Sequence, residues 1–201
     1  PDIGSINKKI KIAYKPQYLN NDIDAEVISI LEKSNDGPIE GSIEEEQIIE
    51  PLKIKKLYNK SLKNLSGGEL QKVAVTSCLL QKVDLYALDE PSAFLDVEDR
   101  IAVGKFLQKF VRSFGKSAII IDHDLQLMDL VSDSIVIFEG VSGIKGQATK
   151  PLPKHAAMNQ FLQSLDITFR RDEKSRRPRV NKDGSRLDKT QKDSLNYYYK
   201  K

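Results

Sequence analysis

The feature that most restricts the fold is a set of short apolar runs that end abruptly in polar residues and alternate with helix-like segments. Residues 83–88 form one such run, and Asp89 and Glu90 follow it directly. Residues 117–121 form a second, β-branched run, and His123 stands two positions after it. Short buried strands that alternate with helices indicate an α/β fold with a mostly parallel sheet covered on both faces.

Hydrophobic periodicity and helix-capping residues extend this pattern along the chain. The predicted strands are residues 10–14, 83–88, 117–121 and 134–138. The predicted helices are residues 66–81, 97–114, 125–131 and 155–165, and residues 22–64 are predicted to be helical and irregular. Ligands of such sheets bind beyond the carboxyl ends of the strands, so the polar residues at those ends are candidate functional groups.

The composition of the 201 residues excludes several classes of protein. Apolar residues make up 39% of the chain, enough for a buried core, and a formal net charge of +3 is too balanced to imply a polyanionic partner by itself. The single cysteine, Cys78, excludes an intramolecular disulfide and a cysteine-rich metal site, and favours a reducing compartment. No apolar run approaches the ~18 residues that span a bilayer. The first residues contain neither a signal sequence nor Met, so we expect a piece of a longer protein.

Basic residues are concentrated at the C-terminal end of the chain. Residues 170–201 contain 12 Lys and Arg against five Asp and Glu, and they include few large apolar side chains. We therefore expect that this tail cannot build a core of its own. Two interpretations stay open: a solvated or loosely docked extension, or a segment that contacts phosphate backbones.

The most specific local motif is Leu-Ser-Gly-Gly-Glu-Leu-Gln at residues 65–71. Ser66 is placed to cap a helix whose first turn contains Gly67 and Gly68, which leaves free backbone N–H groups at the positive end of the helix. Glycines allow a phosphate to approach such a backbone closely. Ser-Gly-Gly alone more often marks an ordinary helix cap, but the whole heptad favours a functional role.

Polar side chains at the strand ends suggest nucleotide chemistry. In nucleotide hydrolysis, a first carboxylate such as Asp89 helps to hold Mg²⁺, and a second such as Glu90 orients or deprotonates the attacking water. His123 is placed to contact a terminal phosphate, although a lone histidine is usually structural. Gln17 follows the first predicted strand, where its amide can reach a metal or a water.

In this order and spacing, these elements resemble the ABC-type ATPase cassette over about residues 10–140. The matching elements are the Q-loop glutamine, the signature motif, the Walker B strand, the D-loop and the switch histidine, at Gln17, residues 65–71, residues 83–90, residues 92–96 and His123. The resemblance implies a P-loop NTPase-like fold. Residues 1–150 would be the distal part of the nucleotide-binding domain, with a helical subdomain at about residues 20–80, and residues 151–201 would be a C-terminal extension.

A narrower resemblance points to the second cassette of the ABC subfamily E, the ribosome-recycling ATPases also known as RNase L inhibitors. The similar segments are residues 14–18, 88–100, 131–133, 167–172, 177–179, 181–185 and 197–199. Two residues depart from the family pattern: Phe94 stands where Tyr is expected, and Asp122 where Glu is usual. Neither change should abolish the chemistry.

The resemblance implies an ATPase that uses ATP and Mg²⁺ and drives the splitting of ribosomal subunits. Within one cassette, Asp89 and Gln17 would hold Mg²⁺, Glu90 would be the general base, and His123 would steady the γ-phosphate. A second set would bind the nucleotide of a partner cassette or communicate with it: Ser66, Gly67, Gly68, Gln71 and Asp96. The implied partners are the other cassette, the small ribosomal subunit, and release or initiation factors in the cytoplasm. The basic tail would be available to rRNA, and no membrane is implied.

One element of the family is absent from these 201 residues. A Gly-x-x-x-x-Gly-Lys-Ser/Thr phosphate loop does not occur, and in the cassette it would precede the first predicted strand. We therefore expect feeble ATP binding and no hydrolysis by this chain alone. Two alternatives stay open: another soluble ABC ATPase, such as a translation factor or a transporter motor, and a non-catalytic module that binds RNA or the ribosome.

Overall fold

The computed structural model describes residues 9–141, 143–173 and 178–199. Five cations of the basic tail therefore lie outside the described residues: Lys174, Arg176, Arg177, Lys200 and Lys201. The chain forms two compact units, Pro1–Leu127 and Met128–Lys201. This division lies N-terminal to the boundary at residues 150/151 that the sequence suggested. Among the described residues, no helix is both long and apolar enough to cross a bilayer.

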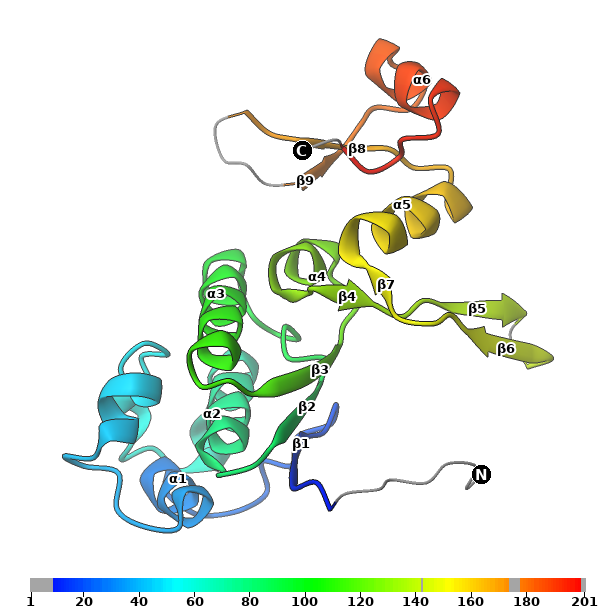
Figure 1. Ribbon diagram of the computed structural model, residues 1–201. Helices are drawn as coiled ribbons and strands as arrows, with labels where there is room; N and C mark the ends of the chain where they lie inside the picture. Colours follow the sequence, from blue (N-terminus) through cyan, green and yellow to red (C-terminus); the bar gives the residue numbers. More distant parts are fainter. Residues whose placement is uncertain (1–8, 142, 174–177, 200–201) are drawn as a thin grey trace. The chain divides into compact units, whose positions relative to one another are not determined.

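The first unit is built on a parallel sheet of three strands in the order β1-β2-β3 (Figure 1). These strands are β1 (Ile12–Lys15), β2 (Leu85–Asp89) and β3 (Ser117–Ile121). The register pairs Ala13 with Tyr86, and Leu88 with Ile120. Parallel neighbours place their carboxyl ends at one edge of the sheet, so the residues that follow β1, β2 and β3 are brought together there.

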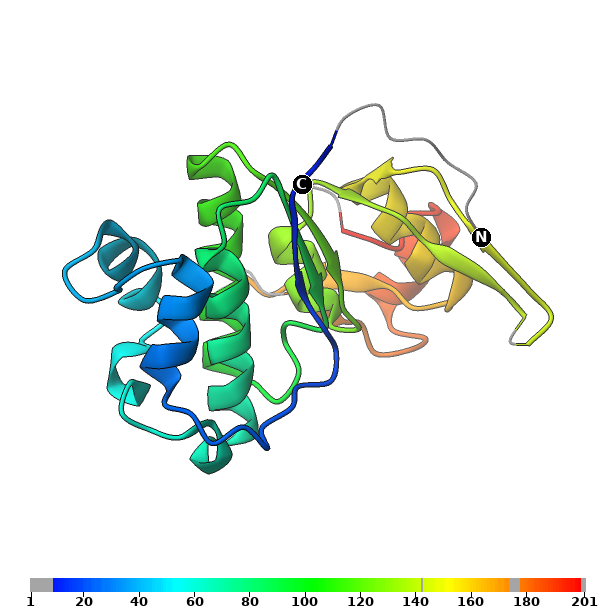
Figure 2. The same cartoon turned by 90° about the horizontal axis from the view of Figure 1, so that it is seen from below.

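Helices cover one face of this sheet. They are α2 (Gly67–Leu80) and α3 (Val97–Ser113), which lie on the same side of the strands in both views (Figures 1 and 2). Tyr86 of β2 meets Phe110 of α3 edge-on, with 5.5 Å between the ring centroids. The opposite face is open: the side chains of Ile119 and Ile121 are 55% and 56% exposed. Within the described residues of the first unit, the expected cover on this second face is therefore not present at Ile119 and Ile121.

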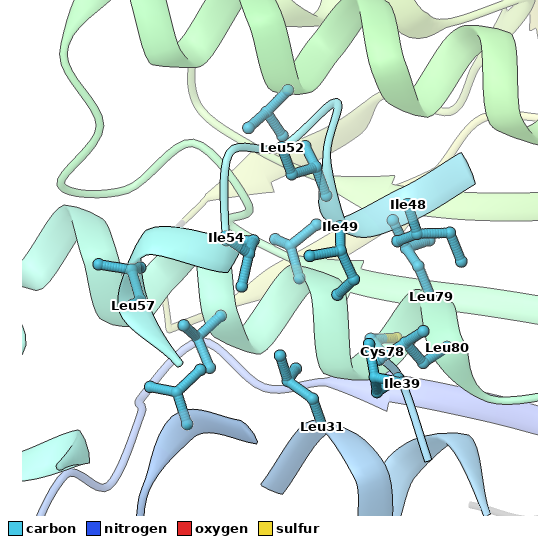
Figure 3. Packing of buried hydrophobic residues seen from close by; sticks show 14 of the residues in the cluster. Leu31, Ile39, Ile48, Ile49, Leu52, Ile54, Leu57, Cys78, Leu79 and Leu80 are labelled. Carbon is cyan, nitrogen blue, oxygen red and sulfur yellow. The ribbon is translucent and has the colours of Figure 1, made fainter. Parts of the chain in front are cut away.

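The hydrophobic core of this unit is one cluster that includes residues of β1, β2 and α3 and extends from the sheet to the helical segments around α2. It joins α2 to α1 (Val27–Asn35) and to short turns of helix: η1 (Glu45–Ile49), η2 (Lys55–Leu57) and η3 (Leu62–Asn64). Figure 3 shows ten labelled members of the cluster, Leu31, Ile39, Ile48, Ile49, Leu52, Ile54, Leu57, Cys78, Leu79 and Leu80. Full burial of each Leu or Ile contributes ~1.5–3 kcal/mol to stability. The packing holds α2, and with it the helix start at residues 66–68, in place.

The second unit begins within α4 (Leu125–Val131) and contains short antiparallel pairs rather than a continuation of the parallel sheet. The pairs are β4 (Ser134–Ile135) with β7 (Leu152–Pro153), β5 (Phe138–Val141) with β6 (Lys145–Ala148), and β8 (Phe169–Arg171) with β9 (Pro178–Val180). The helices α5 (Lys154–Ser164) and α6 (Arg186–Asp193) complete it.

The single strand predicted at residues 134–138 is wrong, because the chain changes partners inside that run. Ile137 exchanges two hydrogen bonds with Thr149: its N–H donates to Oγ1 at 3.0 Å, and its carbonyl accepts from the Thr149 N–H at 2.9 Å. This bridge separates β4 from β5, which then pair with different strands. A run of apolar residues does not reveal which segment each of its carbonyls will bind.

Several described residues of the tail are buried, in a small core that they share with residues 168 and 169 and that contains a network of polar side chains. The buried side chains are those of Thr168, Phe169, Asn181, Asp188, Gln191, Tyr197, Tyr198 and Tyr199. Asn181 donates from Nδ2 to Thr168 Oγ1 at 2.8 Å and to Gln191 Oε1 at 2.6 Å. Thr168 in turn donates to Asp188 Oδ1 at 2.5 Å. A buried polar network is stable when its members satisfy one another, and a count of apolar residues cannot detect that.

Candidate functional site

The site is organised around Glu90, which follows the last residue of β2. Its N–H donates to the carbonyl of Ile121 at 2.7 Å, which ties it to the end of β3. Its backbone is left-handed, with φ of 46°, and the chain then turns through Ser92 and Ala93. A left-handed residue with a side chain is uncommon and occurs mostly where surrounding contacts enforce it. Because of this turn, the Glu90 side chain does not continue the side-chain alternation of β2.

Two residues predicted from the sequence meet this carboxylate at a single oxygen atom. Gln17, two positions after β1, donates from Nε2 to Glu90 Oε1 at 2.9 Å. Nε2 of His123, two positions after β3, lies 3.0 Å from the same Oε1. The His123 side chain is 87% exposed, so its imidazole is accessible to a bound molecule. The structure thus brings together Gln17, Glu90 and His123, which the sequence places far apart.

Asp89 is the last residue of β2, and its neighbour across the sheet is β1. Tyr14 donates from its hydroxyl to Asp89 Oδ2 at 3.3 Å. The pKa of Tyr14 is raised, first by partial loss of hydration and then by the negative charge of Asp89. As the last residue of β2, Asp89 lies at the carboxyl edge of the sheet, and Glu90 is the next residue in the chain.

An open pocket of about 300 Å³ lies beside this edge, lined by Glu90, Ser92, Ala93, Phe94, Arg100, Asp122, His123 and Asp124. Asp122 accepts hydrogen bonds from the N–H of Ser92 at 3.1 Å and from its Oγ at 2.8 Å. Arg100 donates to Asp124 at 2.5 Å and to the carbonyl of Leu95 at 3.1 Å. These contacts anchor the loop after Glu90, a role for Asp122 and Arg100 that sequence reasoning did not identify.

The residues of the 65–71 motif lie at the start of α2. Ser66 caps the helix: the N–H of Glu69 donates to Ser66 Oγ at 3.2 Å, and the N–H of Ser66 donates to Glu69 Oε2 at 3.0 Å. Such a capping box satisfies two otherwise free backbone donors. Gln71, also predicted as a site residue, reaches the carbonyl of Glu90 from Nε2 at 2.5 Å. Gln71 thereby connects the motif to the backbone of Glu90 and not to the Glu90 carboxylate.

The two glycines of the motif lie against the loop that follows Glu90. A Cβ on Gly68 would be 2.9 Å from the carbonyl oxygen of Phe94, and one on Gly67 would be 3.2 Å from the Phe94 side chain. Asp96 caps α3 by accepting from the N–H of Asp99 at 2.8 Å. Gly67, Gly68 and Asp96 therefore border one short loop, and Ser66 directly precedes the two glycines.

Sequence reasoning missed Lys15, the last residue of β1. Its side chain is buried, and its Nζ donates to the carbonyl of Asp89 at 2.6 Å and to that of Glu90 at 3.2 Å. Burial lowers the pKa of Lys15, while the carboxylates of Asp89, Glu90 and Asp122 act in the opposite direction. A lysine before Pro16 carries no signal of this kind in the sequence, because its partners are more than 70 positions away.

The donor atoms at the edge fit a hard divalent cation that is shared with a substrate. The Asp89 carboxylate and the Gln17 amide offer oxygen atoms, the ligand type that Mg²⁺ prefers. In the part of the chain that the structure describes, no three His, Cys, Asp or Glu side chains gather as a metal-binding group. Mg²⁺ is usually held by one or two carboxylates together with substrate phosphates, and this donor set matches that pattern.

Several known proteins have sequences similar to that of this chain. Residues 3–93 match the family model described as ABC transporter. The chain is 42% identical over 201 residues to an uncharacterized ABC transporter ATP-binding protein of Methanocaldococcus jannaschii, and 36% identical over 199 residues to translation initiation factor RLI1 of Saccharomyces cerevisiae. Both alignments cover 99% of this chain and 33% of the relative. The chain thus spans about a third of the length of these curated relatives.

Solved structures give the same family. A structure described as RNase-L Inhibitor matches with a TM-score of 0.90 and 42% identity, covering 99% of this chain and 39% of that chain. An archaeal ribosome recycling factor in complex with ribosomal stalk protein also matches with a TM-score of 0.90 and 42% identity, covering 100% of this chain and 39% of that chain. The fold is therefore that of a P-loop NTPase of the ABC cassette type. Residues 3–93 thus match the family model of the ABC-type ATPases, and the relatives and solved structures that resemble the whole chain are of the RNase L inhibitor family.

Proposed function

We propose that this chain is part of an ATP-hydrolysing cassette, the second of its parent protein, that drives the splitting and recycling of ribosomal subunits. The observation that carries the proposal is the convergence of Gln17 and His123 on the carboxylate of Glu90. A carboxylate between an amide and an imidazole at the end of a parallel strand is suited to orient a water and accept its proton. In this proposal, residues 1–150 are the distal part of the nucleotide-binding domain and residues 151–201 its extension.

Each side chain at the sheet edge has a distinct part in the reaction. Glu90 acts as the general base on the attacking water, and the Gln17 amide holds the carboxylate in position. His123, exposed beside Glu90, donates a hydrogen bond to the terminal phosphate. Asp89 and the oxygen of Gln17 hold Mg²⁺. Bound by these two residues, Mg²⁺ would supply positive charge to offset the negative charge that develops during phosphoryl transfer.

The start of α2 contacts a nucleotide that is bound mainly by another cassette of the same protein. The two cassettes are arranged head-to-tail. Ser66 caps the helix, and Gly67 and Gly68 supply backbone N–H groups at its positive end, which favours negative phosphate. Gln71 and Asp96 connect this surface to the Glu90 turn and to α3. Because the 201 residues contain no phosphate-loop motif, the chain alone binds ATP weakly and does not hydrolyse it.

The proposed partners follow from the relatives. One similar solved structure is described as a complex with archaeal ribosomal stalk protein, and another as a model of ribosome-bound archaeal Pelota and the recycling factor. We infer a cytoplasmic protein that acts on the small ribosomal subunit together with release or initiation factors. In the second unit, Arg170, Arg179, Lys182 and Lys189 are exposed and available to rRNA phosphates.

The test uses the full-length parent protein and the Glu90→Gln variant. Gln has nearly the same shape as Glu but cannot act as a base, so Mg²⁺-dependent release of phosphate from ATP should be lost while ATP binding remains. Gln147→Ala is the control, because Gln147 is exposed on β6 of the second unit. Unchanged turnover in Glu90→Gln would refute the proposed role of Glu90. Absence of ATPase activity in the unmodified protein would refute the function.

A second candidate is a non-catalytic module that binds RNA or the ribosome, and the missing phosphate-loop motif favours it. It predicts salt-dependent ribosome binding that survives Glu90→Gln, with no ATP hydrolysis by the parent protein. Neutralising Arg170 and Arg179 should then weaken binding and flatten its salt dependence. Turnover that requires Glu90 would exclude this candidate.

A further inference from the structure

The backbone of Glu90 is held by two side chains that come from distant segments of the chain. Lys15, at the end of β1, donates from Nζ to the carbonyl oxygen of Glu90 at 3.2 Å and to that of Asp89 at 2.6 Å. Gln71, in the second turn of α2, donates from Nε2 to the same Glu90 oxygen at 2.5 Å. One carbonyl thus accepts hydrogen bonds from side chains of two different elements, β1 and α2.

Both donors are polar side chains at fully buried positions, where core packing alone would not require a polar residue. Lys15 is 1% exposed and Gln71 is 0% exposed. A buried ammonium or amide is unfavourable unless it is hydrogen-bonded, and an apolar side chain of similar volume would pack at either position without that requirement. The hydrogen bonds to Asp89 and Glu90 are therefore the specific feature that these two polar side chains supply.

The accepting peptide needs such support because its conformation is unfavourable. Glu90 has φ of 46°, in the left-handed region that residues with a side chain rarely adopt. This conformation turns the chain so that the Glu90 carboxylate meets Gln17 and His123. The same carbonyl also accepts from the N–H of Ala93 at 3.3 Å within the turn. Without the two side-chain donors, this longer contact alone would hold the carbonyl, and the carboxylate would be less firmly placed.

We propose that Lys15 and Gln71 are positioning residues for the reaction of Glu90. They clamp the Glu90 carbonyl from two sides and so maintain the turn that aims the carboxylate. This inference rests on the proposed function, because positioning of Glu90 matters only if Glu90 acts on a water. The clamp also joins Glu90 to α2, the helix that begins directly after its cap at Ser66.

The test measures ATP hydrolysis by the full-length parent protein with Lys15→Met or Gln71→Leu. Each substitution keeps approximate volume and removes the donor. Each should lower kcat by about 10-fold or more while KM for ATP changes by less than about threefold, because a small misplacement of a catalytic group slows chemistry without removing nucleotide contacts. The losses should also be non-additive in the double variant, because both side chains hold one oxygen.

Lys116→Met is the matched control. Lys116 donates from Nζ to the carbonyl of Val83 at 2.8 Å, which is the same kind of contact at the opposite end of β2. Its kcat should stay within about twofold of the unmodified protein, so a larger loss there would show that any such substitution harms the sheet. If Lys15→Met does not fold, Gln71→Leu tests the same carbonyl by itself.

The outcomes separate this inference from the proposed function. Loss of kcat at nearly constant KM in Lys15→Met and Gln71→Leu, with Lys116→Met unaffected, supports the clamp. Turnover within about twofold of normal in both variants, while Glu90→Gln abolishes it, overturns the clamp and leaves the proposed function intact. A parallel rise in KM and fall in thermal stability, without loss of kcat, also overturns it, because those changes indicate a purely structural role.

Discussion

Gln17 Nε2 lies 2.9 Å from Glu90 Oε1, although 73 positions separate the two residues in the chain. The contact exists because β1 and β2 are parallel neighbours, so the residues that follow them emerge at the same edge of the sheet. His123 reaches the same oxygen from the end of β3. Three consecutive strands of one sheet thus supply the three side chains that the proposed chemistry needs.

Removal of the Gln17 amide should slow the reaction. In the full-length protein, Gln17→Ala leaves the Glu90 carboxylate with one contact fewer and removes one proposed oxygen ligand of Mg²⁺. We expect kcat for ATP hydrolysis to fall by about 10- to 100-fold, the range in which misplaced catalytic groups act. Steady-state phosphate release measures this, with the exposed Gln147→Ala as control. Activity equal to that of the control would contradict the role of Gln17.

Gly68→Ala should destabilise the loop after Glu90. The added Cβ would lie 2.9 Å from the carbonyl oxygen of Phe94, so the loop must move. Overpacking of this kind destabilises by ~1–3 kcal/mol, more than the helix propensity gained when Ala replaces Gly. The free energy of unfolding from urea titration of the protein measures the effect.

Gly37→Ala is the control for that experiment, because a Cβ on Gly37 would meet nothing within 4 Å. Its free energy of unfolding should not fall by more than about 0.5 kcal/mol. Equal stability of Gly68→Ala and Gly37→Ala would show that the loop accommodates the methyl group freely.

Asp129 should be important for the stability of the second unit. Its carboxylate accepts hydrogen bonds from the buried hydroxyls of Tyr198 and Tyr199, the latter at 2.8 Å. Asp129→Ala leaves both hydroxyls without this acceptor, at an expected loss of about 2–4 kcal/mol. Hydrogen exchange reports it locally, because the Phe169 N–H donates to the carbonyl of Tyr197 and should exchange faster.

The control for Asp129 is the exposed Asp193 at the end of α6. Asp193→Ala should leave exchange at Phe169 within about twofold of the unmodified protein. If Asp129→Ala behaves in the same way, the two tyrosines do not depend on this carboxylate.

The polar core of the tail should weaken in acid. The hydrogen bond from Thr168 holds the pKa of Asp188 below its ordinary value, and further contacts from the N–H of Gly184 and from Lys192 act in the same direction. A depressed pKa means that the stabilisation is complete above the pKa of the unfolded state and is lost as pH falls through the folded value. Protection of the Asn181 N–H, corrected for the intrinsic exchange rate, should therefore decrease below about pH 4.

Asp188→Asn removes the titrating group and keeps an oxygen that accepts from Thr168. In this variant, the additional acid sensitivity of Asn181 protection should disappear. Identical pH dependence with and without the Asp188 carboxyl would mean that another group controls it.

Several elements could be predicted from the sequence because their causes are local. The helices expected at residues 97–114 and 125–131 are found at Val97–Ser113 and Leu125–Val131, and the strand at residues 117–121 is found unchanged. Apolar periodicity and capping residues specify such elements within a few turns of chain. The family could also be predicted, because the order and spacing of its motifs are properties of the chain itself.

Long-range contacts decided the rest. No pattern near Lys15 indicates that its ammonium is buried against Asp89 and Glu90, because the register of β1 on β2 creates that contact. The polar core around Thr168 and Asn181 likewise appears only when β8 and β9 pair. The sequence by itself determined the local elements and the chemical types present at the strand ends. The tertiary structure decided which of those groups touch, because each contact depends on two segments meeting in a register that neither encodes alone.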